Sequence, residues 1–153
     1  MRKQLNILFI CTGNTCRSPM AKVIADKMIA DRGLNIRTDS AGLTAFDGDF
    51  PAMNAVKVME RRGIDMDSHR AKPLTPSMCK WANYIFVMTQ RHLDGLLTIY
   101  PQYTKKASTL SVEDIEDPYG QNMAAYEKAA DELEIAIEKR LIEIENEHEQ
   151  QQN

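Results

Sequence analysis

One stretch of sequence decides the expected fold of this chain: Leu5-Asn6-Ile7-Leu8-Phe9-Ile10-Cys11-Thr12-Gly13-Asn14-Thr15-Cys16-Arg17-Ser18-Pro19. Its first six residues form a short, almost wholly apolar run without helical periodicity, which predicts a buried strand. Apolar residues then recur at helical spacing over Arg17–Arg32, a segment that Ser18 and Pro19 open and Gly33 closes. The residues between the two are therefore predicted to form a loop that joins the end of a strand to the start of a helix.

Strand and helix signals alternate along the rest of the chain. Further strands are predicted at Ile36–Ala41, Tyr84–Met88 and Lys106–Leu110, and further helices at Met53–Arg62, Gln90–Ile99 and Gln121–Glu145. Residues 147–153 contain no apolar side chain and are expected to fray. Because strands separated by helices indicate right-handed crossovers, we predict a four-stranded parallel sheet with helices on both faces. No linker or repeat divides the chain, so residues 1–153 are predicted to be one α/β domain.

The composition indicates a globular protein of a reducing compartment. Hydrophobic residues make up 43% and charged residues 27% of the 153 residues. The apolar run near the N-terminus is too short to span a membrane, and no small-residue cleavage pattern follows it. Three cysteines, Cys11, Cys16 and Cys79, are too few for a disulfide scaffold. We therefore expect a cytoplasmic protein without a membrane partner.

The net charge of −3 conceals an uneven distribution. Residues 1–112 hold 16 Lys and Arg against 9 Asp and Glu, whereas residues 113–153 hold 3 against 13. The basic part favours an anionic substrate through its summed field, and the simplest interpretation of the acidic part is one solvated helix face. No nucleic-acid-binding motif accompanies the positive charge, so nucleic acid is not expected as a partner.

The predicted loop has the composition of an anion-binding site. Unpaired N–H groups at the start of a helix, together with the helix dipole, attract anions. Gly13 lets the backbone turn and approach a ligand closely, and Arg17 offers a planar fork of donors for two oxygens. The same positive field would stabilise a thiolate at Cys11. An anion site beside a thiolate predicts phosphoryl transfer through a phosphocysteine.

Cys11-Thr12-Gly13-Asn14-Thr15-Cys16-Arg17-Ser18-Pro19 resembles the signature loop of the low-molecular-weight protein phosphatases, and the resemblance spans nearly the whole chain. Three other segments resemble further parts of that family: Asp39-Ser40-Ala41-Gly42, His69-Arg70-Ala71 and Asp117-Pro118-Tyr119. The resemblance implies a monomeric hydrolase that needs neither metal nor cofactor, acts on a phosphorylated protein and releases inorganic phosphate.

The resemblance also implies a role for each matched residue. Cys11 would be the nucleophile, Arg17 would hold the phosphate, and Asp117 would be the general acid and then the general base. Because Pro118 keeps Asp117 extended, the acid belongs on a loop. Substrate-binding residues would be Thr12, Gly13, Asn14, Thr15, Cys16, Ser18 and Tyr119, supported by Ser40 and His69. Cys16 would either trap an oxidised Cys11 as a disulfide or serve as a small packing residue, and Cys79 is expected to be buried.

Thr15 and Gly120 bear on the substrate. Tyrosine-specific members of the family typically carry a bulky aliphatic residue at the position of Thr15, and a second aromatic residue where this chain has Gly120. The combination here resembles the bacterial protein-arginine phosphatase branch. Because a guanidinium group has only donors and a threonine hydroxyl can accept, we favour phosphoarginine over the alternative, phosphotyrosine. Phe46 and Phe50 either form another wall of the cleft or pack beneath their loop.

Three other functions fit parts of the pattern. A thioredoxin-linked arsenate reductase shares the fold and the loop but needs two further cysteines, and only Cys79 lies outside the loop. A sugar-transport phosphocarrier must keep its phosphocysteine, whereas Arg17 and Asp117 favour its hydrolysis. A non-catalytic phosphoprotein binder has no need of Cys11 together with these two residues.

Overall fold

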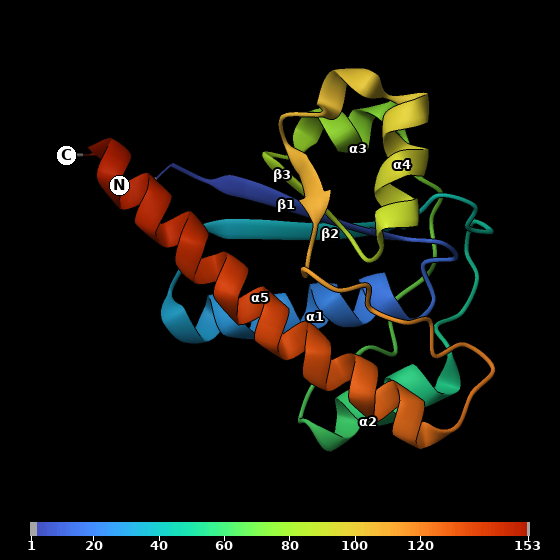
Figure 1. Ribbon diagram of the computed structural model, residues 1–153. Coiled ribbons are helices and arrows are strands. Elements are labelled where there is room, and N and C mark those ends of the chain that lie inside the picture. The colour runs from blue at the N-terminus through green and yellow to red at the C-terminus, as the bar shows by residue number, and fades with distance from the viewer. Residues whose placement is uncertain (1–2, 153) are drawn as a thin grey trace.

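The computed structural model describes residues 3–152, which form one four-stranded sheet between two layers of helices (Figure 1). The strands are β1 (Leu5–Cys11), β2 (Ile36–Gly42), β3 (Tyr84–Val87) and β4 (Ala107–Thr109). All three pairings are parallel, and the strand order is β2-β1-β3-β4. The predicted fold class is therefore confirmed.

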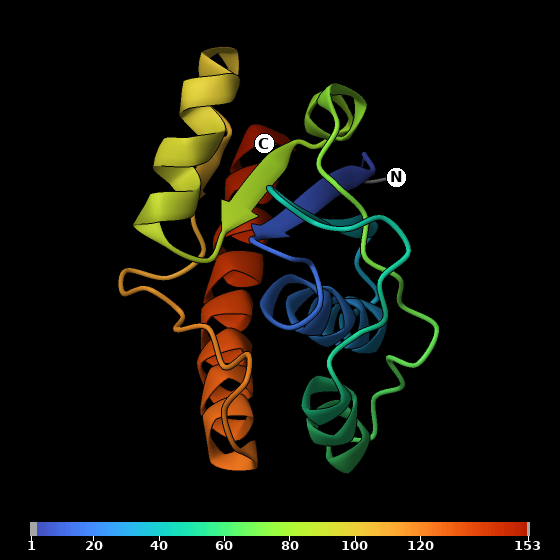
Figure 2. The same ribbon diagram turned by 90° about the vertical axis from the view of Figure 1, so that its right-hand side faces the viewer.

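The helices cover both faces of the sheet (Figure 1 and Figure 2). One side holds α1 (Arg17–Arg32), α2 (Met53–Arg61) and the long α5 (Met123–Gln152), and the other holds α3 (Pro76–Trp81) and α4 (Gln90–Ile99). A short 3₁₀ helix, η1 (Pro101–Tyr103), precedes β4. None of the helices within the described residues is long and apolar enough to cross a membrane.

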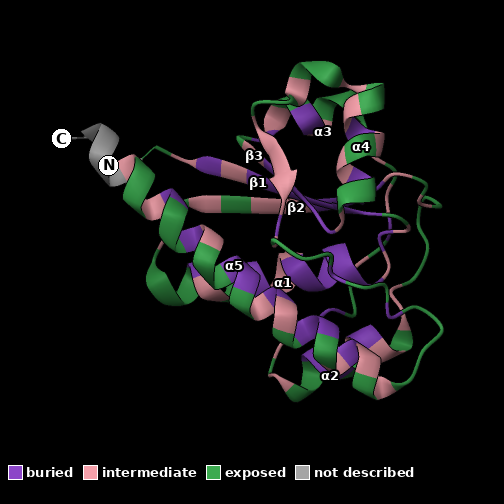
Figure 3. Cartoon of the chain, viewed as in Figure 1, coloured by how far each residue is buried: buried purple, intermediate pink, exposed green. Residues whose placement is uncertain are grey.

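The central strand β1 is apolar because it is buried from both sides. Leu5, Ile7 and Phe9 join the core formed with α1, α2 and α5, while Leu8 and Ile10 join the core formed with α3 and α4. Side chains of a strand alternate between its two faces, so both cores need apolar residues from this one strand. Figure 3 shows buried residues along β1 and on the sides of α1 and α5 that face the sheet.

Two features of the helices differ from the sequence predictions. Helix α3 was not predicted, although Thr75 caps it by accepting the Met78 N–H at 3.3 Å and a proline opens it. The helix predicted to end at Glu145 continues to Gln152 as α5, and fraying of residues 147–153 stays a prediction. The acidic tail contains no helix breaker, and the Tyr84 hydroxyl lies 3.1 Å from Glu147 Oε2. Asn153 lies outside the described residues.

The acidic face of α5 is more than a solvated surface. Glu127, Asp131 and Glu134 surround Arg62 at the end of α2, with N–O distances of 2.8, 2.8 and 2.6 Å. Arg32, the last residue of α1, lies 2.9 Å from Glu138. The uneven charge of the two parts of the chain therefore draws α5 against α1 and α2.

Candidate active site

Cys11 ends the central strand, and the loop that follows lies at the carboxyl edge of the parallel sheet, where such folds bind ligands. Cys11 is buried, and its Sγ lies 2.8 Å from the Oγ of Ser18 in the first turn of α1. Ser18 Oγ also accepts a hydrogen bond of 2.7 Å from Asn14 Nδ2. Since Asn14 is the donor there, the Ser18 proton can go to another acceptor: the Cys11 sulfur at 2.8 Å or the Ala41 carbonyl oxygen at 3.5 Å.

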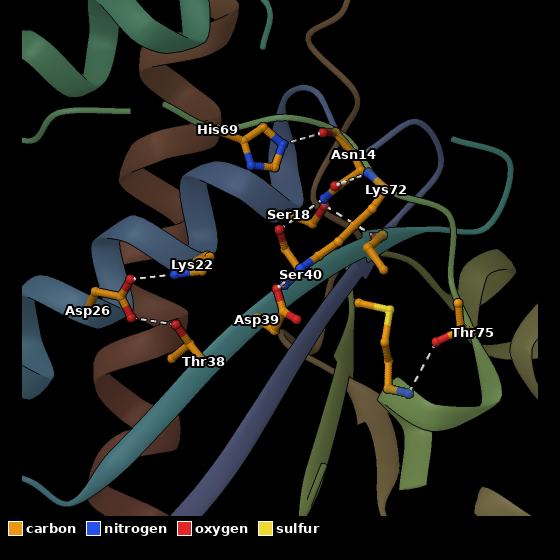
Figure 4. Close-up of polar contacts among 12 residues, drawn as sticks. Asn14, Ser18, Lys22, Asp26, Thr38, Asp39, Ser40, His69, Lys72 and Thr75 are labelled. Atoms are coloured by element: carbon orange, nitrogen blue, oxygen red, sulfur yellow. Dashed lines mark hydrogen bonds and ion pairs between the residues drawn. The ribbon is translucent and has the colours of Figure 1, made fainter. Parts of the chain in front are cut away.

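Asn14 forms hydrogen bonds that connect the loop to the segments around it (Figure 4). Its side chain donates to Ser18 and, at 3.0 Å, to Ser40 Oγ, and it accepts the Lys72 N–H at 3.0 Å. Its carbonyl oxygen lies 2.7 Å from His69 Nε2. Burial lowers the pKa of His69, and because a carbonyl oxygen only accepts, the neutral ring carries its proton on Nε2. Ser40 and His69 thus reach the loop from two distant segments.

Arg17 is buried, and its guanidinium contacts the segment that contains Ile115 and Asp117. Its Nη1 donates to the Ile115 carbonyl oxygen at 2.8 Å, and its Nη2 lies 3.6 Å from Asp117 Oδ2. The Asp117 side chain is 51% exposed, so it faces the cleft opening while Pro118 is buried. The Tyr119 N–H donates to Asp117 Oδ1 at 3.1 Å and orients the carboxylate. The guanidinium fork and the carboxylate therefore lie side by side.

These groups open into a cleft of about 310 Å³. Its lining residues are Cys11, Thr12, Gly13, Thr15, Cys16, Arg17, Thr44, Phe46, Asp49, Asp117 and Tyr119. Phe46 and Tyr119 are largely exposed on its rim, whereas Phe50 does not line it and lies beneath the Arg70 guanidinium, 4.2 Å from its ring centre. A larger groove of about 740 Å³ between α5 and strands β3 and β4 contains none of the predicted site residues.

The three cysteines are unpaired and buried. Cys16 Sγ lies 3.6 Å from the Tyr126 hydroxyl and 3.7 Å from Thr15 Oγ1. Burial raises the pKa of the Cys16 thiol, so it stays protonated at neutral pH. Cys79, a residue of α3, is buried in the core on that side of the sheet, as the sequence predicted. No three His, Cys, Asp or Glu side chains among the described residues are arranged to hold a metal ion.

His92 belongs to the site but was not predicted. Its Nε2 lies 2.8 Å from Thr12 Oγ1, and its N–H donates to Thr89 Oγ1, the N-cap of α4, at 3.1 Å. Burial, followed by the positive charge of Arg17, lowers the pKa of His92 to about 4, so the ring is neutral at physiological pH. A capping threonine two residues after β3 places the first turn of α4 at this edge of the sheet, and that signal could have identified His92.

Gly42, at the end of β2, allows the strand to touch the loop. A Cβ at this position would lie 2.5 Å from the Thr12 carbonyl oxygen and 2.8 Å from the Ala45 Cβ, closer than such atoms approach. Any larger residue here would displace the loop that holds Cys11.

Residues 6–151 match the family of low molecular weight phosphotyrosine protein phosphatases. The chain belongs to this family. A protein-arginine-phosphatase of Geobacillus stearothermophilus is 34% identical over 139 residues, which cover 87% of this chain and 91% of that protein. Another protein-arginine-phosphatase, from Bacillus subtilis (strain 168), is 33% identical over 136 residues, which cover 85% of this chain and 90% of that protein. A solved low molecular weight protein tyrosine phosphatase from T. tengcongensis has a TM-score of 0.89 at 37% identity, covering 92% and 99% of the two chains.

Family membership makes this protein an enzyme that hydrolyses phosphate esters or phosphoramidates with the cysteine-based mechanism general to the family. Its similar proteins carry both substrate names, arginine and tyrosine. The family match supports neither arsenate reduction nor phosphate carriage.

Proposed function

We propose that this phosphatase removes phosphate from phosphoarginine in proteins. Thr15 is the observation that carries the proposal. It lines the cleft, is partly exposed, and its hydroxyl has only the long contact with Cys16 Sγ among the described residues. A hydroxyl in this place can accept a hydrogen bond from a guanidinium group, which an aliphatic side chain cannot.

In the first step, the Cys11 thiolate attacks phosphorus, an S–P bond forms and the bond to the leaving nitrogen breaks. Backbone N–H groups of the loop and the Arg17 guanidinium bind the phosphoryl oxygens, whose charge they offset. Asp117 donates its proton to the leaving nitrogen, so that the arginine side chain departs as an ordinary guanidinium. Ile115 keeps Arg17 in place from behind, at 2.8 Å.

In the second step, water hydrolyses the phosphocysteine. The Asp117 carboxylate accepts a proton from the attacking water, the S–P bond breaks, and inorganic phosphate and the Cys11 thiolate are released. Ser18, 2.8 Å from the sulfur, stabilises the thiolate as a leaving group by donating its hydroxyl proton. Asp117 is again protonated for the next turnover.

Phosphotyrosine is the second candidate, and Phe46 is the observation that favours it. Phe46 lines the same cleft as Tyr119 from another loop, so two aromatic rings border the opening although Gly120 follows Tyr119. Two rings could hold a phenol between them.

A paired assay distinguishes the two candidates. Two peptides of the same sequence, one with phosphoarginine and one with phosphotyrosine at the same position, are compared by kcat/KM. We expect the phosphoarginine peptide to be preferred, and a preference for phosphotyrosine would overturn the substrate assignment. The mechanism is tested separately: Cys11→Ser should abolish hydrolysis of a small aryl phosphate, and turnover retained in that variant would contradict a phosphocysteine.

A further inference from the structure

The charged side chains that line the cleft do not match a substrate whose only charged group is a phosphate. The lining side chains include one cation, Arg17, and two carboxylates, Asp117 and Asp49. Asp117 has the proton-transfer role proposed above and lies beside Arg17, whereas Asp49 forms no ion pair with any described residue. A carboxylate without a counter-ion in an anion-binding cleft disfavours a purely anionic ligand.

We propose that Asp49 is a specificity-determining residue that binds the guanidinium group of phosphoarginine. This inference rests on the proposed function and names a second acceptor, besides Thr15, for the same group. Phosphoarginine carries a positive guanidinium directly beside the phosphoryl group, and phosphotyrosine carries a neutral ring there. A guanidinium has several donors in one plane, and a single threonine hydroxyl cannot satisfy them.

The loop of residues 43–52 holds Asp49 in register with the phosphate-binding loop. Three backbone hydrogen bonds, each of 3.0 Å, join the two loops: Leu43 N–H to Cys11 O, Thr44 N–H to Thr12 O, and Ala52 N–H to Thr15 O. Both ends of the segment are therefore tied to the nucleophile's own loop. A side chain carried between two such ties keeps its place relative to Cys11 when a substrate enters.

Hydrogen bonds within the segment fix Asp49 itself. Its carbonyl oxygen accepts the Ala71 N–H at 2.8 Å, and its N–H donates to the Phe46 carbonyl oxygen at 3.1 Å. Asp49 Oδ1 accepts the Phe50 N–H at 3.0 Å, and Oδ2 has no hydrogen-bond partner among the described residues. One carboxylate oxygen thus orients the side chain, and the other is available to a ligand.

Phe46 completes this side of the cleft. Phe46 is 81% exposed and lines the same opening as Asp49. A guanidinium plane can stack on an aromatic face while its edge donates to carboxylates. This arrangement gives the ring a role with phosphoarginine that does not require a phenol as partner.

The test compares Asp49→Asn with Asp47→Asn. Both changes remove one negative charge from the same exposed loop, but Asp47 does not line the cleft. Asparagine at position 49 keeps an oxygen that can accept the Phe50 N–H, so the loop should keep its shape. Asp49→Ser is a second variant, whose hydroxyl oxygen can also accept this N–H. The phosphoarginine and phosphotyrosine peptides of equal sequence are assayed with each protein, and the melting temperature is recorded.

We expect Asp49→Asn and Asp49→Ser to lower kcat/KM for the phosphoarginine peptide about tenfold, the scale of one hydrogen bond to a charged group. Hydrolysis of the phosphotyrosine peptide should stay unchanged or increase, and Asp47→Asn should change neither rate more than about twofold, as befits a solvated charge. An equal effect on both peptides, or none on either, overturns the role of Asp49.

The wild-type protein tests the proposed function separately. If it prefers phosphotyrosine but the ratio of the two rates still falls in Asp49→Asn, the proposed function fails and the role of Asp49 stands. If the wild-type protein prefers phosphoarginine and the ratio does not change in Asp49→Asn, the proposed function stands and the role of Asp49 fails. A wild-type protein that does not hydrolyse the phosphoarginine peptide at all overturns both.

Discussion

Replacing Asn14 by glycine and by alanine tests how the phosphate-binding loop is held. Asn14 is wholly buried, with a backbone φ of 57°, in the left-handed region. Both substitutions remove its side-chain hydrogen bonds with Ser18, Ser40 and Lys72. Only glycine adopts a positive φ without strain, so the pair separates the contribution of the side chain from that of the backbone.

The structure sets the size of each effect. Three hydrogen bonds at about 1 kcal/mol each predict that Asn14→Gly lowers the free energy of unfolding by about 3 kcal/mol. Asn14→Ala adds about 1–2 kcal/mol of backbone strain and regains about 0.4–1 kcal/mol from a less flexible unfolded chain. The alanine variant should therefore be less stable than the glycine variant by about 1 kcal/mol.

Turnover should fall in both variants. Without Asn14 Nδ2 as donor, Ser18 is no longer oriented toward Cys11 and the loop N–H groups lose their spacing. A misplacement of about 1 Å near reacting atoms costs up to about 100-fold in rate. Urea-induced unfolding measures the stabilities, and hydrolysis of p-nitrophenyl phosphate measures the rates. The reasoning is refuted if Asn14→Gly loses less than about 1 kcal/mol, or if alanine is tolerated as well as glycine.

Four further changes have defined outcomes. Asp117→Asn should slow hydrolysis by about 100-fold or more for aryl phosphates with poor leaving groups and much less for good ones, and an equal loss on both would argue against an acid role. Thr15→Ile should shift the ratio of kcat/KM values toward the phosphotyrosine peptide, and an unchanged ratio would remove Thr15 from recognition. Arg62→Ala should cost about 2 kcal/mol of unfolding free energy, because it removes three ion pairs to α5 and leaves Glu127 with Arg61 alone, whereas Arg61→Ala, with a single exposed ion pair, should cost little. Because the pKa of His92 is lowered to about 4 in the folded protein, the unfolded chain binds more protons below pH 6.5. The free energy of unfolding should therefore fall by about 1–2 kcal/mol as the pH is lowered from 6.5 to 4. Urea titrations at each pH measure this free energy, and in His92→Gln this part of its pH dependence should be absent.

By itself, the sequence determined the parts of this protein that have local signals. The apolar run Leu5–Ile10, the glycine after it and the Ser-Pro start of the next helix predict a strand, a loop and a helix in direct succession. The prediction of a site at Cys11 and Arg17 follows from that succession because unpaired N–H groups at a helix N-terminus are disposed to bind anions. Periodic apolar residues likewise sufficed for the long C-terminal helix, although not for its end, where polar residues continue it to Gln152.

Only the tertiary structure decided what surrounds the loop. His92, Asp49 and Ile115 come from three separate segments. Apart from the capping threonine before His92, no local sequence signal places them near Cys11. They meet there because parallel pairing brings the carboxyl ends of neighbouring strands to one edge of the sheet, so the loops that follow β2, β3 and β4 converge on the loop after β1. Which side chain of each loop faces the cleft depends on strand register and on hydrogen bonds between the loops, and these contacts exist only once the sheet has formed.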